Sequence, residues 1–161
     1  MARGVLFALD DDPAARLAAA DGDAAVRDCI ADIEEQWDTA WLFQTDKAWD
    51  AIHRSLTDGR LLYENGTFPL NHCILGGIQL HAEDHWVVAV TPEEHTADVA
   101  NALAAVTEDV LRAGYARIDV GDYPDKSDAD FAYTWASFRG LPEFYAKAAE
   151  AGRAVVFTVD L

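Results

Sequence analysis

The sequence predicts a single α+β domain in which a small mixed or antiparallel sheet is covered by helices. Short apolar runs at residues 3–9, 86–90 and 155–159 indicate strands, and longer segments between them place apolar residues at helical spacing. Strands and helices do not alternate strictly, which disfavours a doubly wound parallel sheet. A length of 161 residues suits one domain with its own core, so we treat residues 1–161 as one unit.

The first half of the chain begins with the strand at 3–9 and continues into two expected helices. Asp12 followed by Pro13 is a typical helix N-terminus, because aspartate caps well and proline suits the first helical position. We expect this helix to end near residue 20. Asp23 is expected to cap a second helix that runs to about Trp37.

A third helix is expected between Asp46, as its N-cap, and Gly59, as its stop. Trp49, Ile52 and Leu56 share one face at helical spacing and should be buried. Residues 60–75 look extended. The Asn65-Gly66 pair inside them predicts a hairpin turn, since both residues adopt positive φ at low cost.

The second half shows one clear strand and several helices. Residues 86–90 form a continuous apolar run, which is typical of a buried interior strand. Thr91-Pro92 with Glu94 predicts a capped helix, with Val99, Leu103 and Val106 buried. Further helices are expected at 108–114, from Ser127 to 138 and at 142–151, followed by the strand at 155–159.

The charge of the chain is its most unusual property. Asp and Glu number 29 against 12 Lys and Arg, a formal net charge of −17. Residues 1–80 carry 14 acids and 6 bases, and residues 81–161 carry 15 and 6, so the excess is spread along the chain. This field repels phosphate backbones and anionic membranes, so we expect neither nucleic acid nor membrane as a partner. The negative charge either attracts a basic protein partner or only keeps the protein soluble.

Cysteine usage and the N-terminus indicate a reduced, cytoplasmic protein. Cys29 and Cys73 form neither a disulfide framework nor a CxxC motif, and both lie among apolar residues. The apolar start runs directly into Asp10 and is too short for a signal peptide. The sequence contains no apolar run of membrane-spanning length.

No complete catalytic, metal or cofactor motif is found in the sequence. His81 and His85 are four residues apart, yet Glu83 is misplaced for an HExxH zinc helix and a strand follows directly. We interpret this segment as a polar loop, with adventitious metal binding as the alternative. Phosphate-binding glycine loops are missing, and the acidic segment 119–130 lacks the EF-hand pattern. We therefore predict no catalytic residues, no metal and no cofactor.

Two groups of residues are candidates for binding. His53 lies beside the face formed by Trp49, where it is either a core-edge histidine bonded to a backbone carbonyl or a ligand in a pocket. Gly76 and Gly77 could form one edge of that pocket, although close packing between strands also explains this glycine pair. Trp37 and Trp41 lie between expected helices and could line a groove or a subunit interface.

Three blocks of the chain resemble the YfbM-like family of small bacterial proteins. They run from Asp46 to Gly59, across 69–77 and then 90–94, and across 144–152 into the last strand. The segment 81–90 departs from the family, which tends to have a Gly/Pro turn there. The resemblance implies a small cytoplasmic α+β protein with no assigned reaction. The residues that it marks as signature positions are Asp46, Lys47, Trp49, His53, Gly76 and Gly77.

Two functions follow as hypotheses. The first is a non-enzymatic binding module, an immunity-type or regulatory partner of a basic protein, because the chain is uniformly acidic and lacks a catalytic constellation. The alternative is a small-molecule-binding protein or enzyme with a pocket around His53 and Trp49. We expect a monomer or a homodimer, in which case residues 37–43 would form the subunit interface.

Overall fold

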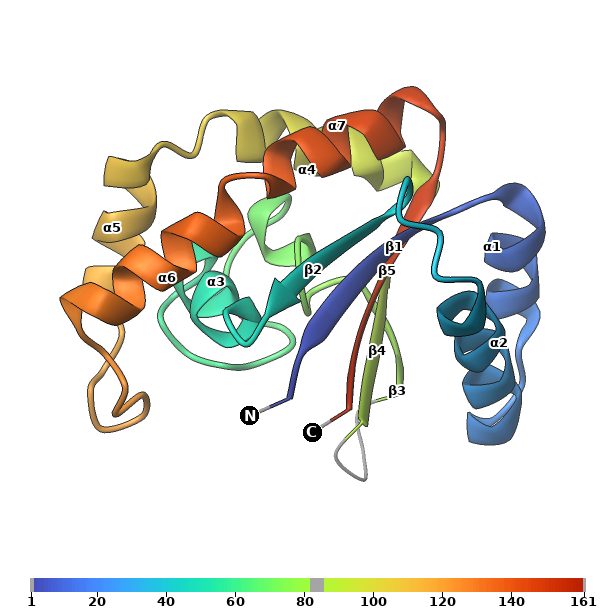
Figure 1. Cartoon of the computed structure of the whole chain (residues 1–161), viewed down its shortest axis with the longest axis horizontal. Helices are drawn as coiled ribbons and strands as arrows, with labels where there is room; N and C mark the ends of the chain where they lie inside the picture. The colour runs from blue at the N-terminus through green and yellow to red at the C-terminus, as the bar shows by residue number, and fades with distance from the viewer. Residues whose placement is uncertain (1, 82–85, 161) are drawn as a thin grey trace.

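A computed structural model describes residues 2–81 and 86–160 and contains, within them, a five-stranded antiparallel sheet with helices on both faces (Figure 1). The order across the sheet is β2-β1-β5-β4-β3, and every neighbouring pair is antiparallel. This confirms the α+β prediction. The strands are β1 (Gly4–Leu9), β2 (Leu42–Asp46), β3 (Ile78–His81), β4 (Trp86–Thr91) and β5 (Ala154–Asp160).

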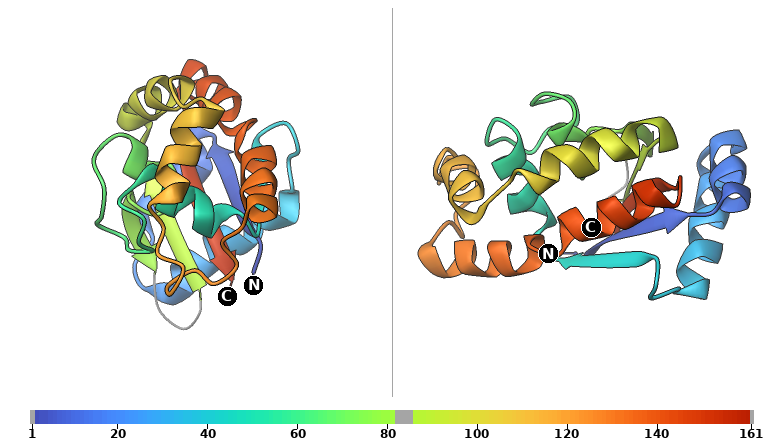
Figure 2. Two further views of the ribbon diagram at one scale, coloured as in Figure 1. Left: turned by 90° about the vertical axis from the view of Figure 1, so that its left-hand side faces the viewer. Right: turned by 90° about the horizontal axis from the view of Figure 1, so that it is seen from above.

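The helices are divided unequally between the two faces of the sheet. One face carries α1 (Asp11–Ala19) and α2 (Asp23–Gln36), seen together at the right of Figure 1. The view from above in Figure 2 shows α4 and α7 running side by side over the other face. The elements on that face are α3 (Trp49–Leu56), the 3₁₀ turn η1 (Leu70–His72), α4 (Glu93–Ala104), α5 (Glu108–Ala116), α6 (Asp128–Phe138) and α7 (Leu141–Glu150).

The central strand β5 is buried from both sides, which accounts for its continuous apolar sequence. Val155, Phe157 and Val159 enter the larger core, under α3 to α7. Val156 enters the smaller core, under α1 and α2. The side chains of β4 are likewise shared between the two cores, and β4 lies between β5 and β3. The predicted interior position of residues 86–90 is therefore confirmed.

The predicted N-caps of the first two helices are displaced. α1 begins two residues earlier than expected, with Asp10 rather than Asp12 at the cap position. α2 follows Gly22, and Asp23 is its first helical residue. Neither cap residue makes a side-chain cap hydrogen bond. The acidic groups instead lie in the first turn of each helix, where they interact favourably with the helix dipole.

Two more predicted caps, Thr91 and Asp46, are the last residues of strands. The Thr91 hydroxyl donates to the carbonyl of His72 at 2.7 Å, and Pro92 takes the cap position of α4. Asp46 ends β2 with a φ of 50°, and Ala48 is the N-cap of α3. A short turn therefore separates β2 from α3, so the Asp46 carboxylate does not cap the helix.

The predicted hairpin at Asn65-Gly66 is wrong. Gly66 does have a positive φ of 77°, but residues 60–77 contain no strand. The buried Asn65 amide donates to Thr57, Asp58 and Arg60 instead. These bonds fold the segment back onto the end of α3, so tertiary hydrogen bonds decide the conformation.

The remaining helix boundaries agree closely with the prediction. Ser127 caps α6, and its hydroxyl accepts a hydrogen bond from the backbone N–H of Asp130 at 3.0 Å. Gly152 follows α7 with a φ of 67°, a conformation that glycine adopts without strain. Cys29 and Cys73 are buried and unpaired, as expected.

Candidate functional site

Trp49 and His53 lie on α3 and are almost completely buried, with exposed fractions of 3% and 1%. The indole N–H of Trp49 donates to the backbone carbonyl of Ala2 at 3.0 Å, and its ring packs against Phe157. Trp49 therefore ties the start of the chain to the larger core. Neither side chain presents an open face to solvent.

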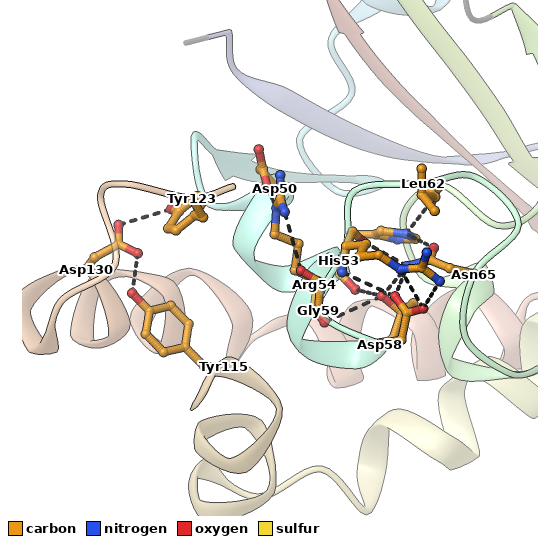
Figure 3. A network of polar contacts seen from close by, with 12 residues as sticks. Asp50, His53, Arg54, Asp58, Gly59, Leu62, Asn65, Tyr115, Tyr123 and Asp130 are labelled. Atoms are coloured by element: carbon orange, nitrogen blue, oxygen red, sulfur yellow. Dashed lines mark hydrogen bonds and ion pairs between the residues drawn. The ribbon is translucent and has the colours of Figure 1, made fainter. Parts of the chain in front are cut away.

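The His53 imidazole fastens the loop that follows α3 (Figure 3). Its Nε2 lies 2.7 Å from the carbonyl oxygen of Leu62 and 2.9 Å from Oδ1 of Asn65. Both partners are acceptors, so Nε2 carries a proton and donates. Burial lowers the pKa of His53, which favours the neutral imidazole. This is the core-edge histidine bonded to a backbone carbonyl, one of the two roles that the sequence allowed.

One turn of α3 also carries a buried ion pair. The Nε of Arg54 lies 2.6 Å from Oδ1 of Asp50, and both side chains are nine-tenths buried. A second nitrogen of Arg54 donates to the carbonyl of Gly59 at 3.3 Å, and the guanidinium lies 5.7 Å from the ring centre of Tyr123. The pair therefore joins α3 to the loop before α6.

Two tyrosines complete this network by sharing one carboxylate (Figure 3). The hydroxyls of Tyr115 and Tyr123 donate to the two oxygens of Asp130 at 2.7 and 3.3 Å. Burial, together with the hydrogen bond to Asp130, raises the pKa of Tyr115 to about 12. These charged and aromatic groups around α3 thus bond to one another, and their arrangement stabilises the fold.

Gly76 and Gly77 allow two close backbone contacts. A Cβ on Gly76 would lie 2.2 Å from the carbonyl oxygen of Asn71, and one on Gly77 would lie 2.2 Å from that of Val90. No side chain fits at either distance. Gly77 therefore lets the chain that enters β3 approach β4, and Gly76 lets it pass close to η1.

Asp46 and Lys47, two further signature positions, lie where β2 turns toward α3. The Tyr133 hydroxyl donates to Oδ2 of Asp46 at 2.7 Å and accepts from the backbone N–H of Lys47 at 3.1 Å. Arg3 forms an ion pair with Oδ1 of Asp46 at 3.0 Å. These contacts hold the positive φ of Asp46 and connect β2 to α6.

The remaining candidates, Trp37 and Trp41, lie in the loop between α2 and β2. Trp37 is 40% exposed, and its ring meets the edge of Phe7. Trp41 is partly buried and lines a cleft of about 710 Å³ bounded by α1, α2 and the end of β1. We call it the α1–α2 cleft, and its apolar lining residues are Phe7, Ala8, Leu9, Pro13, Cys29, Ile33 and Trp41.

Five carboxylates and two guanidinium groups also line the α1–α2 cleft, an excess of three negative charges. Arg16 pairs with Asp32 across the gap between α1 and α2. Arg153 pairs with Asp10 at 2.9 Å and donates to the carbonyl of Ala8 at 3.3 Å. Both cations are therefore already partnered within the protein. The acidic lining residues are Asp10, Asp11, Asp12, Asp32 and Asp38.

Trp41 is the centre of a cation–π group beside this lining. The guanidinium carbon of Arg153 lies 3.6 Å from the indole centre, and the Lys147 ammonium lies 4.2 Å from it. Lys147 also donates to the carbonyl of Ala40. These contacts direct two basic groups onto the protein itself and leave carboxylates at the mouth of the cleft.

The family profile described as Domain of unknown function (DUF1877) matches residues 1–158. The chain belongs to the DUF1877 family. The structure of YfbM from Escherichia coli, described as a protein of unknown function, is similar at a TM-score of 0.69 and 19% identity, over 99% of each chain. This confirms the resemblance to the YfbM-like family, and the structural likeness at this identity shows the fold alone. No curated protein matches the chain.

For this DUF1877 chain, sequence reasoning identified Trp41 but missed the rest of the cleft. The sequence marks Asp12 as a helix start and Asp10 as the end of the apolar N-terminal run, and it indicates no role for Asp11 or Arg153. Asp32 and Asp38 come from other parts of the chain. The acidic run before Pro13 is the one signal of this cleft in the sequence. The other charged groups of the cleft reach this run only when the chain folds.

Among residues 2–81 and 86–160, His, Cys, Asp and Glu side chains form no group of three that could hold a metal ion. His81 ends β3 and lies 2.8 Å from Asp23, whereas His85 falls outside the described residues. In the described part of the chain, no helix has the length and apolar character needed to cross a bilayer.

Proposed function

We propose that this DUF1877 protein is a non-enzymatic binding module, an immunity-type or regulatory partner of a basic protein, and that the α1–α2 cleft takes a basic segment of that partner. The observation that supports this most directly is the excess of three carboxylates in a concave site of about 710 Å³. A concave site lined by one sign of charge concentrates ligands of the opposite sign.

The apolar wall and the carboxylates of the cleft together suit a peptide segment with long cationic side chains. Its inner wall is apolar, with Phe7, Leu9 and Ile33 among the lining residues, and its carboxylates lie on α1, α2 and the loop after α2. A lysine or arginine stem packs on apolar surface while its charged end reaches a carboxylate. Trp37, exposed beside the cleft, adds the aromatic surface that is common in protein interfaces.

The charge of the whole chain supports the same choice of partner. A net charge of −17 accelerates the approach of a basic protein, and the cleft provides a place for specific contact. We place the protein in the cytoplasm, in keeping with two unpaired cysteines. His53 and Trp49 are almost completely buried, so the proposal does not use them as contact residues for the partner.

The test is a pull-down from host lysate at low and high salt with charge-matched variants. The cleft variant is Asp11→Asn/Asp12→Asn/Asp38→Asn. The remote variant is Asp98→Asn/Asp122→Asn/Asp125→Asn, which changes exposed acids on α4 and on the loop before α6 and has the same net charge. Thermal unfolding of both variants confirms that they are folded.

We expect wild type and the remote variant to retain a stoichiometric basic protein that is released at high salt, and the cleft variant to retain none. Equal retention by all three chains would place the contact elsewhere. Retention that is insensitive to salt would contradict the electrostatic basis of the proposal.

A further inference from the structure

We propose that the α1–α2 cleft selects arginine over lysine side chains of its protein partner. This inference rests on the proposed function and adds the chemical group that the cleft recognises. The structure offers three observations for it: the cations that the cleft already holds, the apolar inner wall, and the carboxylates that remain available.

Both cations that line the described part of the cleft are arginines paired with its carboxylates. Arg153 contacts Asp10 while its guanidinium lies 3.6 Å from the centre of the Trp41 ring, and Arg16 pairs with Asp32. A planar guanidinium can stack on an indole and bond a carboxylate in its own plane at the same time. Arg153 makes both contacts at once, and Arg16 makes the carboxylate contact alone.

The apolar inner wall favours the more weakly hydrated cation. A partner side chain that enters past the carboxylates loses water against residues such as Leu9, Cys29 and Ile33. An ammonium group is strongly hydrated and loses more on entry, whereas a guanidinium tolerates partial dehydration and retains five donors. Arginine is therefore the better fit to a site that is acidic at its mouth and apolar inside.

Carboxylates remain available to receive it. Asp11 and Asp12 are exposed and form neither an ion pair nor a side-chain hydrogen bond with the described residues. Asp38 uses Oδ1 to accept from the backbone N–H of Ala40 at 3.1 Å, which leaves Oδ2. Each carboxylate of the first turn of α1 has both oxygens available for a bidentate contact, the geometry that arginine forms and lysine does not.

The experiment compares two eight-residue peptides, in which glycine alternates with arginine or with lysine, by calorimetric titration at low salt. Wild type, the cleft variant and the remote variant defined above are titrated with each peptide. We expect wild type and the remote variant to bind the arginine peptide roughly tenfold more tightly than the lysine peptide, about the effect of one additional charge-assisted hydrogen bond. The cleft variant should lose this preference.

The outcomes separate the two proposals. Equal affinity of wild type for both peptides would overturn the arginine inference and leave the basic-partner proposal standing. Failure to bind either peptide would count against both. An arginine preference that survives in the cleft variant would overturn the inference, because the selective site would then lie elsewhere. Free L-arginine that binds as tightly as the peptide would overturn the choice of a protein as its source.

Discussion

The buried ion pair on α3 allows a direct test of what stabilises this fold. Asp50 and Arg54 lie 2.6 Å apart with both side chains nine-tenths buried. Removing Asp50 leaves the Arg54 charge buried beside the Gly59 carbonyl and the Tyr123 ring, which do not neutralise it. We expect Asp50→Ala to reduce the free energy of unfolding by about 3–5 kcal/mol, because an unpaired buried charge is costly.

The chain provides a matched control at the same helical spacing. Glu108 and Arg112 also lie four residues apart, at 3.5 Å, but each side chain is 52% exposed. Water screens that pair, so Glu108→Ala should cost about 1 kcal/mol or less, including the loss of an acid from the first turn of α5. The comparison separates burial from the mere presence of an ion pair.

The assay is urea unfolding followed by tryptophan fluorescence and circular dichroism. Asp50→Ala/Arg54→Met should recover more than half of the loss caused by Asp50→Ala, because no unpaired charge then remains. If Asp50→Ala does not fold, Asp50→Asn provides a milder change. A cost for Asp50→Ala no larger than that for Glu108→Ala would refute the argument that burial makes this pair important.

Because burial lowers the pKa of His53 and of His72, the folded state resists protonation below the unfolded pKa of about 6.5. Stability should therefore fall as the pH drops below that value, by at most about 1.4 kcal/mol per pH unit for His53 and by less for the more exposed His72. The urea midpoint at pH 7.5 and 5.5 measures this, and a slope that His53→Gln leaves unchanged would contradict it. Gly77→Ala should cost about 1–3 kcal/mol, since its Cβ meets the Val90 backbone at 2.2 Å. Gly121→Ala, where the nearest atom belongs to a surface side chain, should stay within about 0.5 kcal/mol, and equal thermal shifts for the two would contradict the close contact.

The features that sequence predicted well are those with local causes. Apolar residues 86–90 and 155–159 are strands because both faces of each are covered, and an unbroken apolar run reports that directly. Ser127 and Gly152 mark helix ends through their own hydroxyl or backbone freedom. These signals require no knowledge of distant contacts.

The errors arise where side-chain contacts beyond the immediate neighbours in the sequence decide the conformation. Asn65 looks like a turn residue, but His53 and Thr57 bind its side chain and hold it in the interior. Asp46 looks like a helix cap, but Tyr133 and Arg3 engage its carboxylate at the end of β2. In both positions tertiary hydrogen bonds outweigh the local preference.

The α1–α2 cleft could be predicted only in part for the same reason. The uniform acidity indicated a basic partner without locating a site for it. Trp41 was a candidate because it lies in an aromatic segment between helices. Its neighbours Asp10 and Arg153 lie at opposite ends of the chain, and the antiparallel pairing of β1 with β5 brings them together. No spacing rule within the sequence relates two such positions.

A chemical-shift map of the ¹⁵N-labelled protein, recorded during titration with the arginine-containing peptide, tests whether the α1–α2 cleft binds a basic segment. We expect the largest shifts at the backbone amides of Asp11, Asp12 and Asp38 and at the indole N–H of Trp41, and we expect them to disappear at high salt. Shifts centred instead on the acidic loop 119–128, or spread evenly over all acidic surfaces, would contradict the claim that this cleft is the binding site.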